Sequence, residues 1–233
     1  MFLSRLLHKP PALDAAQRQR LAAWEALPEA DLGTPHMQAR YVVVDVESTG
    51  LDIKRDHLIA IGACVVEAGR IALSQSFEVI LRQAAVSDRD NILVHGIGGE
   101  RQREGLPPAE ALLAFLDFAG KAPFIAYHAV FDQTMIERAL VRHLGLRCRR
   151  QWLDLAYVMP VLRPDLIGSH KSLDDWTALY GIPNYARHSA LADALATAQL
   201  WLVALHLATA RDLTSYKALQ TQAKAERWLN RAY

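Results

Sequence analysis

Two carboxylates at the end of an apolar stretch are the residues whose types and spacing most directly suggest chemistry. Asp45 and Glu47 lie in the run Tyr41 to Gly50, whose β-branched start predicts a buried strand. Side chains two residues apart on a strand point to the same face, so both acids would project together. Because such a pair loses hydration and repels itself, it requires a positive partner, and a divalent cation is the natural one. A solvated turn that happens to carry both acids is the alternative interpretation.

Three further residues could complete such a site. Asp132 opens a predicted helix directly after a short predicted strand, at the edge where open α/β sheets bind ligands, although an ordinary helix N-cap is the simpler role. His188 and Asp193 lie at the beginning of another predicted helix. Five residues correspond to about 140° around an ideal helix, so these two share a site only if His188 precedes the regular turns and folds back.

Composition restricts the classes of function. The 233 residues are 52% hydrophobic and carry a formal net charge of +1, so any contact with nucleic acid must be local. The two cysteines fit neither a zinc motif nor a disulfide framework, and we expect a cytoplasmic protein. The N-terminus lacks the sustained apolar core of a secretory signal. The apolar stretch 195–210 is interrupted by Gln199 and His206 and is too short for a membrane span, so it predicts a core helix.

The elements that must position the acids form an α/β pattern. Strands are predicted over 41–47, 58–67, 70–81, 124–127 and 152–155, and helices over 15–27, 108–118, 131–144, 155–162, 172–180, 188–209 and 212–229. The first three strands have short connections and favour an antiparallel meander. Alternating helices and strands follow, which predicts a mixed five-stranded sheet of this meander plus parallel strands, flanked by helices.

The chain divides into three predicted parts. A helical N-terminal arm covers 1–40, a main domain covers 41–210, and a C-terminal amphipathic helix lies within 211–233. Asp14 and Gln17 have the spacing of a capping box at the start of the arm's helix. The arm and the C-terminal helix are the surfaces through which a homodimer contact or a protein partner is expected.

The ordered motifs resemble a known family. Asp45-x-Glu47, the segment from Tyr127 to Asp132, and His188 followed by Asp193 resemble the signature of the DEDDh 3′–5′ exonucleases, which include the epsilon proofreading subunit of bacterial DNA polymerase III. Supporting similarities run from Tyr41 to Leu207, and comprise the segments 47–51, 94–97, 153–154 and 171–174. The resemblance implies a ribonuclease H-like fold and hydrolysis of phosphodiester bonds from a 3′ end.

The resemblance also implies how the chemistry is divided. Asp45, Glu47, Asp132 and Asp193 would hold two Mg²⁺ or Mn²⁺ ions, which prefer oxygen ligands and, about 3.5–4 Å apart, stabilise the attacking and departing oxygens. His188 would be the general base, and a free imidazole has a pKa of about 6.5. It must be neutral to act, so activity should rise from mildly acidic to neutral pH. The product would be a nucleoside 5′-monophosphate.

Substrate contacts follow from the same comparison. Single-stranded or frayed 3′ ends of DNA are the expected substrate, and the residues expected to contact the terminal nucleotide are Ser48, Thr49, Gly50, Leu51, His95, His128 and Phe131. His128 departs from the family, which usually has Asn there, so local substrate geometry or metal preference is expected to differ. For Phe131, the alternative to a stacking contact with substrate is a role in the apolar core. Asp154 and Asp174 are assigned structural roles, and a cluster of arginines between 138 and 150 is either a backbone-tracking surface or a solvated face.

Two other functions are consistent with these residues. Nothing in the sequence shows how a 2′-hydroxyl is received, so an exoribonuclease or oligonucleotide hydrolase is the first alternative. The second is a catalytically inactive nucleic-acid-binding or polymerase accessory module, against which the complete set of acids argues.

Overall fold

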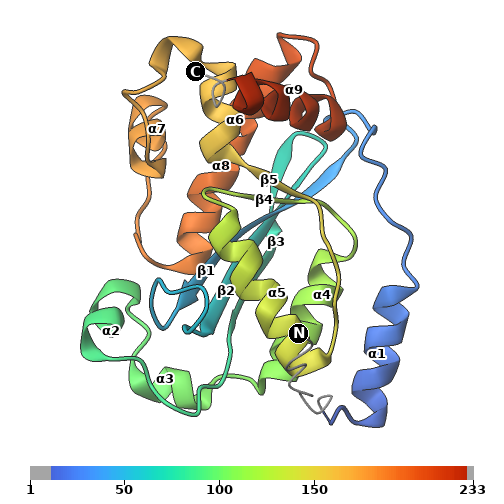
Figure 1. Ribbon diagram of the computed structural model, residues 1–233, viewed down its shortest axis with the longest axis vertical. Helices are drawn as coiled ribbons and strands as arrows, with labels where there is room; N and C mark the ends of the chain where they lie inside the picture. The colour runs from blue at the N-terminus through green and yellow to red at the C-terminus, as the bar shows by residue number, and fades with distance from the viewer. Residues whose placement is uncertain (1–11, 230–233) are drawn as a thin grey trace, which may run out of the picture.

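The described residues, 12–229, are built on one mixed sheet. Its strands in the computed structural model are β1 (Arg40–Ser48), β2 (Leu58–Glu67), β3 (Arg70–Ile80), β4 (Phe124–Ala126) and β5 (Trp152–Asp154). They lie in the order β3-β2-β1-β4-β5, with antiparallel pairing among the first three and parallel pairing from β1 to β4 and from β4 to β5 (Figure 1). The predicted fold class is confirmed.

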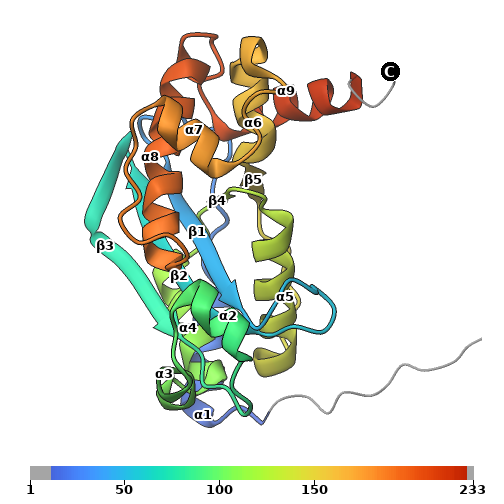
Figure 2. The same ribbon diagram turned by 90° about the vertical axis from the view of Figure 1, so that its left-hand side faces the viewer.

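Helices cover both faces of this sheet. They are α1 (Ala15–Glu25), α2 (Arg89–His95), α3 (Gly99–Glu104), α4 (Pro108–Ala119), α5 (Val130–Leu144), α6 (Leu155–Leu162), α7 (Leu173–Leu179), α8 (Ala190–Thr209) and α9 (Tyr216–Leu229). Figure 2 shows α8 and α5 on opposite sides of β1. The strand thus lies at the centre of a three-layer structure.

The side chains of β1 alternate between the two helical layers. Val42, Val44 and Val46 belong to the apolar cluster that includes residues of α4 and α5. Tyr41 and Val43 belong to the cluster that includes residues of α6, α8 and α9. This alternation is the two-residue period of a strand buried on both faces. It places the two acids later in β1 on the side of α8.

A glycine allows α8 to lie directly against the sheet. A Cβ atom at Gly62 of β2 would fall 2.1 Å from the carbonyl carbon of Ala190 and 2.2 Å from the backbone nitrogen of Leu191. No side chain fits in that space, so the first turn of α8 rests on the backbone of β2. Gly62 pairs with Asp45 in the sheet. The start of α8 therefore lies beside the acidic end of β1.

Two helix starts differ from their prediction, and two short helices were missed. Regular helix begins at Ala190 and Tyr216, rather than 188 and 212, because His188 and Asp212 take left-handed backbone conformations with φ of 63° and 60°. The seven-residue α2 and the six-residue α3 are too short to show apolar periodicity. An N-cap aspartate and a left-handed C-cap glycine, Asp88 and Gly96, bound α2 and were the available signal.

The N-terminal helix packs against α4. Trp24 is 3% exposed and belongs to the same apolar cluster as Phe115. Arg20 forms ion pairs of 2.8 Å with Glu110 and 2.6 Å with Asp117. The first eleven residues of the predicted arm lie outside the described range, as do the last four of the chain.

Within the described residues, α8 alone is long and apolar enough to cross a membrane. Of its most apolar stretch, 56% is buried inside the fold. Leu200, Trp201 and Ala204 are completely buried and pack against the sheet with Tyr41. This is the packing of the core helix that the interrupted apolar pattern predicted.

Candidate active site

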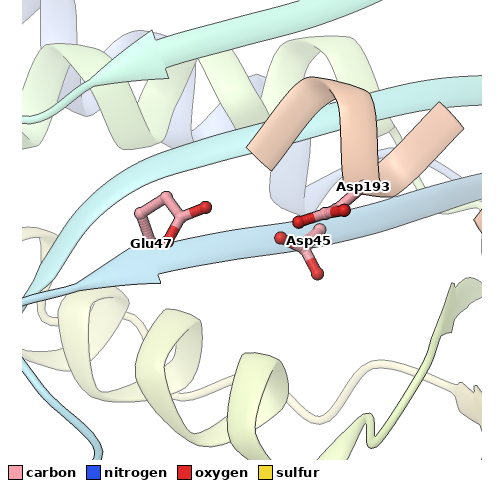
Figure 3. A group of neighbouring side chains, drawn as sticks. All are labelled: Asp45, Glu47 and Asp193. Atoms are coloured by element: carbon pink, nitrogen blue, oxygen red, sulfur yellow. The ribbon is translucent and has the colours of Figure 1, made fainter. Parts of the chain in front are cut away.

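Carboxylates from two elements meet at the end of β1. Asp45 and Glu47 project from one face of the strand, and Asp193 lies in the first turn of α8 (Figure 3). One ligand oxygen from each of the three lies within 4.8 Å of the other two. Asp193 is 3% exposed, whereas the two acids of β1 are half-buried. The tight contact of α8 with Gly62 brings the third acid to the first two.

Asp132 approaches the same strand from its other edge. Odd and even residues of β1 direct their N–H groups to opposite edges, and the N–H of Val42 donates to the carbonyl of Pro123 beside β4. Because β4 ends at Ala126, the N–H of Val46 lies beyond it, and this group lowers the pKa of the Asp132 carboxyl against the larger effect of burial. Asp132 is 4% exposed and raises the pKa of Asp45 by charge repulsion. It lies near the cluster but outside the group of three mutually close acids.

Burial and repulsion both oppose ionisation of these acids. The pKa of Asp45 is raised well above its ordinary value, first by desolvation and then by repulsion from Asp132, Asp193 and Glu47. Desolvation, with repulsion from Asp193, raises the pKa of Glu47 to about 8. The pKa of Asp132 is also raised, chiefly by burial. A cation at this position would remove the repulsion.

The loop before α8 is organised around Asp193. Its Oδ1 accepts hydrogen bonds from the side-chain amide of Asn184 and, at 2.9 Å, from Nη1 of Arg187. Its Oδ2 accepts from the backbone N–H of His188 at 2.9 Å. Arg187 also forms an ion pair with Asp174 at 2.9 Å. Asn184 and Arg187 were not among the residues predicted for the site. A cation directly before the histidine was the available signal.

His188 lies next to the cluster, as the fold-back model required. Its left-handed backbone conformation ends the loop before α8 begins. In the described part of the chain, its hydrogen bond to the cluster comes from the backbone N–H, and its side chain is exposed. The imidazole is therefore accessible to solvent, while its backbone is held at Asp193.

The residues after Glu47 form a loop that is held by side-chain hydrogen bonds. Ser48 Oγ donates to the carbonyl of Gly50 at 2.6 Å, and Thr49 Oγ1 donates to Oδ1 of Asp56 at 2.9 Å. A Cβ at Gly50 would lie 2.6 Å from the Asp56 carboxylate. Leu51 is 87% exposed at the tip. The loop thus displays an apolar side chain from a fixed backbone beside the acids.

Hydrogen bonds to backbone carbonyls explain why the predicted basic cluster is only partly available. The Arg138 guanidinium donates to the carbonyls of Ile53, Lys54 and Asp56, which fastens this loop to α5. Arg150 is 9% exposed and bonds to the carbonyl of Ala122. These two arginines therefore have structural roles. The exposed arginines of the cluster are Arg142, Arg147 and Arg149.

His95 carries a buried donor without a partner. The backbone N–H of Ile97 donates to its Nδ1 at 3.0 Å, so the neutral ring holds its proton on Nε2. Burial lowers the pKa of His95 and favours that neutral form. Nε2 has no hydrogen-bond partner among the described residues. Asn91, also on α2, donates to the carbonyl of Thr49 at 2.5 Å, which ties this helix to the loop.

The remaining predicted contacts have structural surroundings. Phe131 is half-buried and packs against the apolar cluster under β1. His128 is exposed, with φ of 61°, and its N–H donates to Oδ1 of Asp154 at 2.9 Å. Asn and His are both among the residues that tolerate this left-handed conformation, which accounts physically for the exchange. Asp154 also accepts from the N–H of Ala156, consistent with its predicted structural role.

The donor set suits a hard divalent cation. Its ligand atoms are carboxylate oxygens, which Mg²⁺ and Mn²⁺ prefer over nitrogen or sulfur. The raised pKa values of Asp45 and Glu47 show that the acids lack sufficient compensating charge. The residues present therefore fit the predicted metal.

The sheet order, the two helical layers and the acidic edge define a ribonuclease H-like fold. Residues 42–201 match the family model described as Exonuclease, and the chain belongs to that family. It is 30% identical over 194 residues to a DNA polymerase III subunit epsilon-like protein of Rhodobacter capsulatus, covering 82% of this chain and 27% of that protein. It is also 30% identical over 165 residues to a PolC-type DNA polymerase III of Thermotoga maritima, covering 70% and 12%.

Solved structures share the fold. Exonuclease I of E. coli in complex with a dT13 oligonucleotide has a TM-score of 0.63 and 19% identity, with 74% of this chain and 42% of that chain covered. The chain thus spans about a quarter or less of the two relatives named above and less than half of this exonuclease.

Proposed function

We propose that the protein is a metal-dependent 3′–5′ exonuclease that hydrolyses single-stranded or frayed DNA ends and releases nucleoside 5′-monophosphates. The observation that carries this proposal is the convergence of Asp45, Glu47 and Asp193 to within 4.8 Å, inside the matched exonuclease region. Three acids brought together at the edge of a sheet are costly to the fold, and the cost is explained if they bind a cation.

Each acid has a distinct position in the proposed metal centre. Asp45, Glu47 and Asp193, whose ligand oxygens lie closest together, would hold the ions together with Asp132, whose charge acts on Asp45. When bound, Mg²⁺ or Mn²⁺ would neutralise the phosphate, activate the attacking water and stabilise the leaving oxygen. The N–H of Val46 favours the charged form of Asp132, which is the form that would bind a cation.

His188 is the proposed general base. Its backbone is held by Asp193, and its imidazole is exposed beside the acids, from where it can accept a proton from water at the scissile phosphate. The loop with Ser48, Thr49, Gly50 and Leu51 would support the terminal nucleotide, and Nε2–H of His95 would supply a hydrogen bond to its sugar or phosphate. Phe131 and His128 are proposed to shape this site rather than to react.

DNA is the preferred substrate because the solved neighbour carries a DNA oligonucleotide and the curated relatives are named for DNA polymerase III. Such relatives also favour a cytoplasmic location. Association with a polymerase or a second copy, through the arm or the C-terminal helix, is a separate proposal. Truncation of either segment should then abolish association in analytical ultracentrifugation.

The deciding experiment follows the degradation of 5′-labelled single strands. Matched DNA and RNA oligonucleotides are incubated with wild type, Asp45→Asn and Glu67→Gln, with Mg²⁺, Mn²⁺ or chelator. Glu67 is the control because it is an exposed acid at the opposite end of β2 from the residue paired with Glu47. We expect a ladder that shortens from the 3′ end, in wild type and Glu67→Gln only, and only with metal.

The other outcomes have definite meanings. A ladder with RNA alone would assign the chain to the exoribonucleases. Binding of either strand by a folded, metal-loaded protein that releases no mononucleotide would replace the proposal with an accessory binding module.

A further inference from the structure

One arginine joins the acidic cluster to a neighbouring helix. Arg187 contacts Asp174 near the start of α7 through two pairs of atoms, Nε to Oδ1 at 2.9 Å and Nη2 to Oδ2 at 3.1 Å. Its remaining terminal nitrogen, Nη1, lies 2.9 Å from Oδ1 of Asp193. The guanidinium is thus anchored on one side by a bidentate pair and touches a proposed metal ligand with the other.

The two aspartates differ in their surroundings. The side chain of Asp174 is 61% exposed, that of Arg187 is 38% exposed, and that of Asp193 is only 5% exposed. Asp174 can therefore keep Arg187 while water still solvates the pair. Asp193 has little access to water and depends on protein donors for its charge.

The same atom of Asp193 is required twice. Oδ1 accepts from both Asn184 and Arg187, and Oδ2 accepts from the N–H of His188. Oδ1 already accepts two hydrogen bonds, one for each of its lone pairs, so a metal can bind this oxygen only if one of the two donors leaves it. Arg187 is the donor that a divalent cation would also repel, because both are positive.

We propose that Arg187 is an internal counter-cation of the acidic cluster, which occupies Asp193 before metal binds and withdraws toward Asp174 when metal arrives. This inference rests on the proposed metal centre and adds a positioning residue to it. The exchange costs part of the metal's binding free energy, so Arg187 weakens metal affinity while it keeps the metal-free site intact.

The arrangement also couples metal binding to the loop that carries His188. Asn184, Arg187 and His188 all donate hydrogen bonds to Asp193. Release of Arg187 breaks one side-chain hydrogen bond, while the hydrogen bond from the backbone N–H of His188 remains. Asp174 limits how far Arg187 withdraws. The loop is therefore held in both states, by different sets of contacts.

The test measures metal affinity and stability rather than activity. Mn²⁺ binding is followed by isothermal titration calorimetry in chelator-stripped wild type, Arg187→Gln, Asp45→Asn and Arg163→Gln, and melting temperatures are recorded with and without saturating Mn²⁺. Arg163 is the matched control, because it also forms a bidentate pair with an aspartate, Asp165, at 2.9 and 2.7 Å, in the short 3-10 turn that follows α6. That pair includes none of the clustered acids.

We expect Arg187→Gln to bind Mn²⁺ about three- to fivefold more tightly than wild type, the size of one partly exposed ionic contact. Its metal-free melting temperature should fall, and saturating Mn²⁺ should narrow the difference from wild type, because the metal replaces the lost charge. Arg163→Gln should leave the affinity unchanged.

An arginine with a merely structural role predicts a different pattern. The counter-cation proposal would be overturned if Arg187→Gln bound Mn²⁺ no more tightly than wild type. It would also be overturned if saturating Mn²⁺ did not reduce the difference in melting temperature between the two proteins. If wild type binds Mn²⁺ and Asp45→Asn does not, the proposed metal centre stands even when the counter-cation fails. Wild type that binds no Mn²⁺ would remove both.

Discussion

The position of the acids at the end of β1 makes their ionisation unfavourable. Glu47 shares a strand face with Asp45 and lies close to Asp193, so ionising it places negative charge against negative charge in a partly dry environment. The ordinary pKa of this glutamate is 4.5 and the folded-state value is about 8. Between these values the metal-free folded protein retains a proton that the unfolded chain has lost.

A pH dependence of stability follows from Glu47. Its stabilising contribution is complete below pH 4.5 and is lost as the pH rises through about 8. In chelator, the free energy of unfolding of wild type should therefore fall with rising pH by about 2 kcal/mol more than that of Glu47→Gln. Urea denaturation of both proteins between about pH 5 and 8 measures this. If the free energies of unfolding of the two proteins changed in parallel with pH, the charge repulsion at Glu47 would have to be relieved by another group.

His188 should affect turnover without affecting metal binding. His188→Gln is expected to lower the rate of mononucleotide release by about 10²- to 10⁴-fold, the range for loss of a general base. Calorimetric Mn²⁺ affinity should stay at the wild-type value, since the described contact to Asp193 comes from the backbone N–H. A variant that loses metal as well would show that the imidazole acts as a ligand instead.

At the scale of elements, the site depends on how closely α8 approaches the sheet. The backbone of its first turn occupies the space that a side chain at position 62 would fill. Asp193 lies in that turn, and Asp45 is the sheet partner of Gly62. A small displacement of the helix would therefore separate the acids.

Gly62→Ala should destabilise the protein and weaken the site together. The added methyl meets backbone atoms 2.1–2.4 Å away, which cannot rotate aside, so we expect a loss of about 3 kcal/mol or more and weaker Mn²⁺ binding. Gly98→Ala is the control, because a Cβ there meets nothing within 4 Å. Urea denaturation and calorimetry decide. A Gly62→Ala protein of wild-type stability would contradict the described contact.

At the scale of the whole molecule, the N-terminal helix and the sheet share one apolar cluster. Trp24 packs with residues of α4 and β4, and its indole N–H donates to the carbonyl of Gly120 at 3.0 Å. The Nζ of Lys121 lies over the Trp24 ring, 3.7 Å from the ring centroid. The predicted separation of residues 1–40 from the main domain can be tested through this contact.

Removal of Trp24 should cost stability far from the acids. Trp24→Ala is expected to lower the free energy of unfolding by about 3 kcal/mol, while Gln19→Ala on the exposed side of α1 should change it little. One cooperative transition, lowered as a whole, would show that the arm folds with the main domain. A separate early transition in hydrogen exchange, confined to α1, would show that the arm is an independent unit.

The sequence by itself predicted most of the elements and proposed the candidate site residues. Strand periodicity predicted the meander, and the capping box of Asp14 and Gln17 is present as expected from its spacing. The acids of β1 were predicted to share a face because that follows from the two-residue period of a strand. Such inferences succeed because they concern residues that are near one another in the chain.

Only the tertiary structure decided which distant groups meet. The approach of Asp193 to Asp45 depends on the absence of a side chain at Gly62, and the contacts of Arg187 join residues from α7 and α8 through a loop with no periodic pattern. The local conformational preferences of the residues predict neither contact. They are set by the packing of the helix on the sheet and by the charge that the packed acids accumulate, and both exist only once the chain has folded.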